Sequence, residues 1–203
     1  MSTSFDRYMQ DKFPGMQLEP PLFYNADVGI RFEIGDPDPL VSDQQYFEQV
    51  RHRSIQLFRS AHNNDDELYI VLILHLRPQV RPFKIKVFRN AVKNKKALKK
   101  LSCNSIEWAD DEEDGWSAYR YVLECRTSDL KTANLFSSDY RIYIFNATRD
   151  TIFHFYDSRG LDIVSNATGP LQALYHTYND WILDYDRERV DHMFHRIHPE
   201  YED

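Results

Sequence analysis

The sequence predicts an α+β protein, folded as a single domain over residues 1–203, in which helices pack on a mostly antiparallel sheet of about six to eight strands. Three observations favour this class. A chain of 203 residues is long for one domain and short for two. With 42% hydrophobic residues it can bury a sizeable core. Strand-like segments follow one another in runs with helices interspersed, and no repeat or linker divides the chain.

The first part of the chain predicts a helix followed by two strands. The helix covers residues 4–13 and ends at a Pro-Gly pair. Strands are expected over residues 22–24 and 28–34. In the second strand apolar residues alternate with Arg31 and Glu33, which is the pattern of a strand with one buried face.

Ser42 and Gln45 open the next helix with a capping-box pattern, in which each side chain hydrogen-bonds the other residue's backbone. This helix ends near residues 62–64. Its apolar stripe at helical spacing consists of Phe47, Val50, Ser54, Leu57, Phe58 and Ala61.

The middle of the chain contains a nearly continuous apolar run, residues 68–76, rich in Ile, Leu and Val. Such a run is typical of a central strand that is buried on both faces. A further strand is expected over residues 83–88 and a basic helix over residues 90–101. An acidic run at residues 110–114 is placed in a loop, and a strand over residues 116–125 follows it.

The last part of the chain predicts a hairpin and a long helix. A short helix around residues 130–136 precedes two strands, residues 140–145 and 151–156, which a tight turn joins into a hairpin. One more strand is expected over residues 161–165. The final helix is expected over residues 170–194, with one kink, because its apolar residues recur at helical spacing.

Net charge, tyrosine content and cysteine number indicate the kind of partner and the cellular location. The net charge of −7 disfavours nucleic acid as a partner and favours basic proteins. The 13 tyrosines exceed what a core holds with hydroxyl partners, so many are expected at a contact surface. Cys103 and Cys125 form no disulfide framework, and no segment resembles a signal peptide or a membrane span. The sequence therefore predicts a cytoplasmic protein with no membrane contact.

Residues 156–162 are the most distinctive segment. Asp157 and Asp162 flank Arg159 beside the predicted hairpin. As a functional cluster they would serve acid–base chemistry or anion binding, since arginine binds carboxylate or phosphate with two parallel hydrogen bonds. In the structural interpretation, which is favoured, Asp157 closes a turn, Gly160 supplies a positive φ, and Arg159 pairs with Asp162 or a helix end.

A second distinctive segment surrounds Trp181. Asp180 and Asp184 are four residues apart, and therefore on one face of the predicted helix, and Arg187 follows three residues later. Such a face suits a cation or a basic partner. A solvated face with an Asp184–Arg187 pair is the favoured interpretation.

Histidine recurs every third residue at His192, His195 and His198. This spacing can bring two imidazoles to one metal ion, but zinc sites use three or four ligands and no cysteine pair is near. Histidines near the end of a helix also suit its dipole. We therefore expect neither a metal site nor a cofactor.

Two charged runs of opposite sign lie in the middle of the chain. The basic run, from Lys93 to Lys100, would contact phosphates, yet no base-stacking aromatic motif accompanies it. The acidic run would steer a basic protein at long range. It consists of Asp110, Asp111, Glu112, Glu113 and Asp114.

The chain resembles the DUF3885 family of bacterial proteins. The likeness lies from Arg141 onward, in IYIFNATRDTIFHFYDSRGLDIVS and LYHTYNDWILDYDRERVDHMF, and near the N-terminus in PLFYNADVGIRFEIG. The family pattern has a second Asp where this chain has Ser158. The resemblance implies a unified fold and a bacterial origin, and it carries over no catalytic mechanism.

The function that the sequence favours is a non-catalytic bacterial binding protein of the inhibitor or immunity type. It would cover a partner protein, such as a basic toxin or enzyme, with an acidic, aromatic-rich surface. Its expected contributors, besides the acidic run, are Tyr156, Asp157, Arg159, Asp162, Trp181 and Asp184.

The sequence leaves open two alternative functions and the oligomeric state. One alternative is a hydrolase or nuclease-like enzyme that uses His154, Asp157, Arg159 and Asp162. It is disfavoured because neither G-x-S-x-G, H-E-x-x-H nor a Walker loop occurs. The other is a nucleic-acid-binding protein that uses the basic run. Exposed aromatic residues also allow a homodimer.

Overall fold

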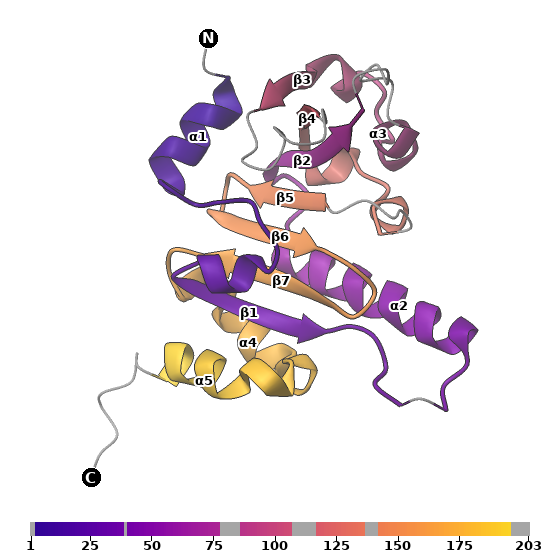
Figure 1. Cartoon of the computed structure of the whole chain (residues 1–203), viewed down its shortest axis with the longest axis vertical. Coiled ribbons are helices and arrows are strands. Elements are labelled where there is room, and N and C mark those ends of the chain that lie inside the picture. Colours follow the sequence, from indigo (N-terminus) through magenta and orange to yellow (C-terminus); the bar gives the residue numbers. More distant parts are fainter. Residues whose placement is uncertain (1–2, 39, 78–85, 107–116, 137–141, 196–203) are drawn as a thin grey trace.

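The computed structural model describes residues 3–38, 40–77, 86–106, 117–136 and 142–195. Within them, one seven-stranded sheet has the order β1-β7-β6-β5-β2-β4-β3, and every neighbouring pair is antiparallel (Figure 1). The predicted α+β class with a mostly antiparallel sheet is confirmed. The strands are β1 (Val28–Glu33), β2 (Glu67–Leu76), β3 (Leu101–Ile106), β4 (Ser117–Arg126), β5 (Ile142–Asn146), β6 (Thr151–Phe155) and β7 (Gly160–Ser165). The α-helices are α1 (Ser4–Lys12), α2 (Asp43–Ala61), α3 (Lys86–Ala91), α4 (Gln172–Thr177) and α5 (Arg187–His195).

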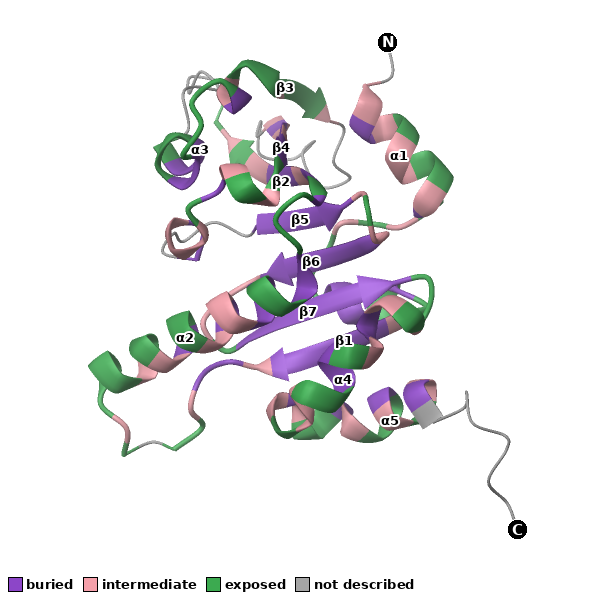
Figure 2. Cartoon of the chain, turned by 180° about the vertical axis from the view of Figure 1, so that it is seen from behind, coloured by how far each residue is buried: buried purple, intermediate pink, exposed green. Residues whose placement is uncertain are grey.

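Helices α2 and α1 cover opposite faces of the sheet. Because side chains alternate along a strand, neighbouring residues enter different cores. On one face Phe153 of β6 contacts Phe58 of α2, with ring centroids 5.7 Å apart. On the other face Phe145 of β5 contacts Phe5 of α1 at 4.9 Å. Figure 2 shows that β5, β6 and β7 are buried along their whole length.

The predicted start of α2 is confirmed. Ser42 and Gln45 form both bonds of the capping box, and the stripe from Val50 to Ala61 is buried against the sheet. Phe47, however, is 59% exposed rather than part of this stripe. The first turns of α2 extend past the end of the sheet, and there Tyr46 packs against the core while the adjacent Phe47 faces outward (Figure 1).

Two predicted strands are helical. Residues 22–24 lie in a 3-10 turn, η1 (Leu22–Asn25), directly after the cis peptide Pro20–Pro21. This turn lets the adjacent side chains of Leu22 and Phe23 both be buried, which a strand with one buried face would not allow. The predicted strand over residues 83–88 is contradicted at its end, where α3 begins at Lys86; its first part lies outside the described residues.

The predicted basic helix over residues 90–101 is also wrong. The chain leaves the helix because two backbone bonds tie it to a distant segment: Lys93 N–H donates to Asp129 at 2.7 Å, and Lys131 N–H donates to Ala91 at 2.6 Å. A short 3-10 turn, η2 (Ala97–Lys100), then leads into β3. The sequence of β3 has little apolar alternation, and its pairing with β4 holds it as a strand.

The final helix is broken rather than kinked. Between α4 and α5 lie two 3-10 turns, η6 (Asn179–Trp181) and η7 (Asp184–Asp186), with extended backbone at Ile182. Ile182 bridges Phe32 of β1, and the N–H of Leu183 donates to the carbonyl of Arg31 at 2.9 Å. Pairing with the edge of the sheet therefore outweighs the helical pattern. Asp180 and Asp184 consequently share no helical face.

The central strand and the hairpin follow the prediction. β2 lies between β4 and β5, and β5 pairs with β6 across the tight turn that contains Asp150 with φ of 51°. The short helix expected around residues 130–136 is only a 3-10 turn, η4 (Thr132–Asn134). None of the helices in the described ranges is long and apolar enough to cross a membrane.

Candidate functional site

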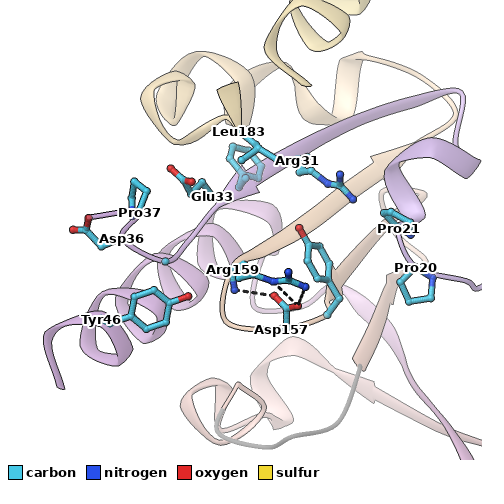
Figure 3. A pocket seen from close by; sticks show the side chains of 13 residues that line it. Pro20, Pro21, Arg31, Glu33, Asp36, Pro37, Tyr46, Asp157, Arg159 and Leu183 are labelled. Carbon is cyan, nitrogen blue, oxygen red and sulfur yellow. Dashed lines mark hydrogen bonds and ion pairs between the residues drawn. The ribbon is translucent and has the colours of Figure 1, made fainter. Parts of the chain in front are cut away.

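An open groove of about 630 Å³ lies beside the turn between β6 and β7 (Figure 3). Five segments form it: the Pro20–Pro21 peptide, the end of β1 with the loop that follows it, the start of α2, the β6–β7 turn, and Leu183 between η6 and η7. Its lining consists of Pro20, Pro21, Arg31, Phe32, Glu33, Gly35, Asp36, Pro37, Tyr46, Tyr156, Asp157, Arg159 and Leu183.

The β6–β7 turn is closed by Asp157 and Arg159. One carboxylate oxygen of Asp157 accepts the backbone N–H of Arg159 at 2.8 Å, and the other accepts its Nε and Nη2 at 3.0 and 2.6 Å. Burial raises the pKa of Asp157, but these bonds and the Arg159 charge outweigh it and lower that pKa overall. The expected turn is present, although Arg159 pairs with Asp157 and not with Asp162. Arg159 remains 83% exposed in its side chain, at the rim of the groove.

Two tyrosines of the groove pack on glycine backbones. A Cβ added to Gly160 would lie 2.2 Å from the hydroxyl oxygen of Tyr156, and one added to Gly35 would lie 2.5 Å from that of Tyr46. The Tyr46 hydroxyl also donates to the carbonyl of Ser158 at 3.0 Å. The expected positive φ at Gly160 is therefore wrong, because Gly160 begins β7, and glycine is required there for lack of space. Each ring therefore lies directly against the backbone of a glycine.

A buried ionic network lies below the groove. Arg31, 8% exposed, donates from Nε to Asp162 at 3.0 Å and from Nη1 to Asp186 at 3.1 Å. Asp162 also accepts the backbone N–H of Phe23 at 3.0 Å, and Asp186 accepts the Tyr24 hydroxyl at 2.7 Å. The network connects β1, β7, η1 and η7 by hydrogen bonds and ion pairs below the groove.

Burial changes the protonation of two groups in this region. It raises the pKa of Asp162, even though the Arg31 guanidinium beside it acts in the opposite direction. Burial and the neighbouring Asp162 charge also raise the pKa of Tyr156, so its hydroxyl stays protonated at neutral pH. The aromatic wall of the groove is therefore uncharged and able to donate a hydrogen bond.

The predicted contact residues separate into three groups. Tyr156, Asp157 and Arg159 line the groove. Asp162 is completely buried below it, so it supports the surface without being part of it. Trp181 and Asp184 belong to the C-terminal segment instead. The acidic run, Asp110 to Asp114, lies outside the described residues.

Trp181 and Asp184 both contact other side chains of the protein. The Trp181 ring packs on Tyr178, with centroids 4.8 Å apart, and the Arg53 guanidinium lies over it at 5.0 Å. The expected pair between Asp184 and Arg187 is present at 3.2 Å.

The four residues of the enzyme alternative form two separate pairs of neighbours. His154 and Asp162 lie opposite one another in the β6–β7 ladder, where His154 is buried and stacks on Tyr143 with ring centroids 4.1 Å apart. Asp157 is paired with Arg159 in the turn, and Asp162 is paired with Arg31. Within the described ranges, no three His, Cys, Asp or Glu side chains come together as metal ligands.

The basic run and the C-terminal histidines lie away from the groove. From Lys93 to Lys100 the five lysines are exposed, but on a turn and a 3-10 segment rather than on one helical face. His192 is exposed on α5, while the side chains of His195 and His198 lie outside the described residues.

Sequence reasoning missed the residues that hold the site together. Arg31 occupies a polar position of an alternating strand, which normally faces solvent, and nothing local marks its burial. Tyr46, Glu33 and Asp36 also went unnoticed as groove residues. The only local signal was the Pro20–Pro21 pair, which indicates a constrained segment.

Comparison with known proteins gives a family but no activity. A family model described as "Domain of unknown function (DUF3885)" matches residues 5–186. The chain is 22% identical over 205 residues to the uncharacterized protein YnaE of Bacillus subtilis (strain 168), covering 88% of this chain and 96% of that protein. No solved structure matches the chain.

Proposed function

The chain belongs to the DUF3885 family of bacterial proteins, and on that premise we propose that it is a non-catalytic binding protein of the inhibitor or immunity type. It covers part of another protein's surface with the groove at the β6–β7 turn. The observation that carries this proposal is the pair of tyrosines, Tyr46 and Tyr156, fixed on glycine backbones at the groove wall.

Fixed aromatic side chains suit protein recognition. Tyrosine, tryptophan and arginine are enriched at interfaces and dominate their binding energy. A side chain that is already immobile loses little conformational entropy on binding, so more of its contact energy appears as affinity. The groove combines two such rings with the exposed Arg159, and Arg31 in its lining is already paired with Asp162 and Asp186.

The charge of the groove favours a basic partner. Asp157 is neutralised by Arg159, and Arg31 is opposed by two buried carboxylates. Glu33 and Asp36 lie at one end of the groove, and the single charge of Arg53 opposes both of them (Figure 3). Together with the net charge of −7, they attract a basic surface and raise its association rate.

The experiment is affinity capture from a bacterial host followed by binding of the purified pair. Glu33→Lys and Asp36→Lys reverse charges in the groove. Asp65→Lys makes the same change beyond the opposite end of α2 and serves as the control. We expect a partner that binds wild type and the control alike, and binds the groove variants at least about tenfold more weakly. The captured partner's own activity should fall when wild-type protein is added.

Two results would contradict the proposal. Equal binding by all variants would place recognition outside the groove, and an unchanged activity of the captured partner would remove the inhibitory role. Recovery of nucleic acid, with an affinity that falls steeply with salt and with Lys96→Glu, would support the alternative based on the run from Lys93 to Lys100. A cytoplasmic location is part of the proposal, since Cys103 and Cys125 are both free thiols.

A further inference from the structure

The two edge strands of the sheet, β1 and β3, differ in whether the chain itself covers them. At the β1 edge, the carbonyl of Arg31 accepts the N–H of Leu183 at 2.9 Å, and the carbonyl of Glu33 accepts Nη1 of Arg53 at 2.8 Å. The β1 edge is therefore covered by the chain itself. At the opposite edge β3 pairs with β4 alone among the described strands, and it lies at the outer margin of the sheet in Figure 1.

Within the described residues, strand β3 carries none of the features that normally protect an edge. Natural edge strands avoid pairing with other molecules through charged residues, prolines, bulges or a covering segment. The six residues of β3, LSCNSI, include no charge, proline or glycine. Cys103, Asn104 and Ser105 in its centre are exposed. In the part of the chain that the structure describes, this edge is therefore open to another strand.

The local hydrogen bonds indicate which backbone groups face outward. The N–H of Leu101 donates to the carbonyl of Leu98, so Leu101 does not exchange ladder bonds with Leu123 of β4. Because bonded and non-bonded pairs alternate in an antiparallel ladder, the backbone groups of Leu101, Cys103 and Ser105 point away from β4. Among the described residues, no hydrogen bond reaches the backbone of Cys103 or Ser105 from that side.

We propose that β3 pairs antiparallel with β3 of a second copy of this chain, about a two-fold axis at Cys103. Outward-facing residues must pair with outward-facing residues, so the register with the greatest overlap puts Cys103 opposite Cys103 of the second copy. Leu101 then lies opposite Ser105 of that copy. The two sheets become one continuous sheet, and this inference does not depend on the groove.

Two arguments, one from charge and one from the size of the assembly, favour a second copy of this chain as the partner of β3. A strand without charge opposes no like charges when it pairs with itself. Lys99 and Lys100 are exposed just before β3, and antiparallel pairing separates the two lysine pairs by about 20 Å along the strands. That distance exceeds the screening length of about 8 Å, whereas parallel pairing would place the lysines side by side. Because the β1 edge is covered, assembly stops at a closed dimer.

The first test is sedimentation of the full chain combined with cross-linking. We expect a concentration-dependent dimer between about 1 and 300 μM, a range that reveals weak association. Directly opposite residues have Cα atoms about 5.5 Å apart, within the span of a disulfide. Mild oxidation should therefore join two chains through Cys103, while Cys125 is buried. Cys103→Ser should remain a dimer but lose the cross-link. A wild-type chain that is monomeric throughout this range would overturn the proposal.

The second test uses charge at the axis. Cys103→Lys and Cys103→Glu each place two like charges opposite one another, so each variant alone should have a dissociation constant raised at least about tenfold. A mixture of the two should dimerise again, because the charges then attract. Position 103 is exposed, so both variants should keep the wild-type circular dichroism spectrum. A Cys103→Lys variant that dimerises like wild type, or a mixture that stays monomeric, would contradict pairing at Cys103.

Discussion

Replacing Gly160 by alanine tests whether the groove is preorganised. The added methyl group would lie 2.2 Å from the hydroxyl oxygen and 3.0 Å from Cζ of Tyr156. It would also lie 2.9 Å from the carbonyl oxygen of Phe32, which is part of the β1 backbone. Moving the tyrosine ring relieves only the first two contacts. The third requires β1 and β7 to separate, and these strands are paired in register there.

This crowding should lower the free energy of unfolding of the Gly160→Ala variant. Forcing an extra methyl group into a packed site destabilises a protein by about 1–3 kcal/mol. For a chain of 203 residues this corresponds to a fall in melting temperature of about 2–12 °C. Displacement of Tyr156 should also weaken binding of any partner that occupies the groove.

Urea and thermal unfolding measure the effect, with Gly169→Ala as the matched control. No atom lies within 4 Å of a Cβ at Gly169, and its φ is not positive, so this substitution should be neutral or stabilise by up to about 1 kcal/mol. In the Gly160→Ala background, Tyr156→Phe removes the closest contact and should restore part of the loss. Equal stability of Gly160→Ala and wild type would refute the claim that glycine makes room for the ring.

Two further predictions concern buried ionisable side chains. Burial lowers the pKa of His62 to about 4, so the neutral imidazole stabilises the fold above pH 6.5 and this contribution is lost as the pH falls toward 4. From pH 8 to pH 5 the free energy of unfolding should fall by about 2 kcal/mol from this group, and His62→Leu should remove that part of the pH dependence in urea unfolding; an unchanged slope would count against it. Arg31→Met leaves Asp162 and Asp186 buried without their cation, which should destabilise the protein by about 3–5 kcal/mol at pH 7. This loss of stability should be smaller at lower pH, where Asp162 with its raised pKa takes up a proton. A destabilisation below about 1 kcal/mol at pH 7 would show that the network contributes little.

Local pattern determined much of the fold. The apolar run of β2, the capping box at Ser42 and the β5–β6 hairpin were predictable, because each depends on residues that are neighbours in the sequence. The turn closed by Asp157 was predictable for the same reason. Prediction failed where tertiary contacts opposed the local pattern, as at residues 90–101 and at Ile182, which pairs with β1 instead of continuing a helix.

The candidate site depended on contacts that no local pattern contains. Arg31 meets Asp162 and Asp186, which lie 131 and 155 residues later in the chain. Alternation in a strand indicates which side chains share a face, but it does not say what covers that face.

By itself, the sequence determined the fold class, most strands, the start of α2 and the tight turn at Asp157, since short-range periodicity and turn chemistry specify these. Only the tertiary structure decided that Arg31 is buried, that Gly160 makes room for Tyr156, and that β1 and β3 are the two edge strands of the described sheet, of which β1 is covered. The burial of Arg31 and the covering of β1 are contacts between segments far apart in the chain, and the crowding at Gly160 includes the Phe32 carbonyl of β1. Such contacts exist only after the sheet has formed.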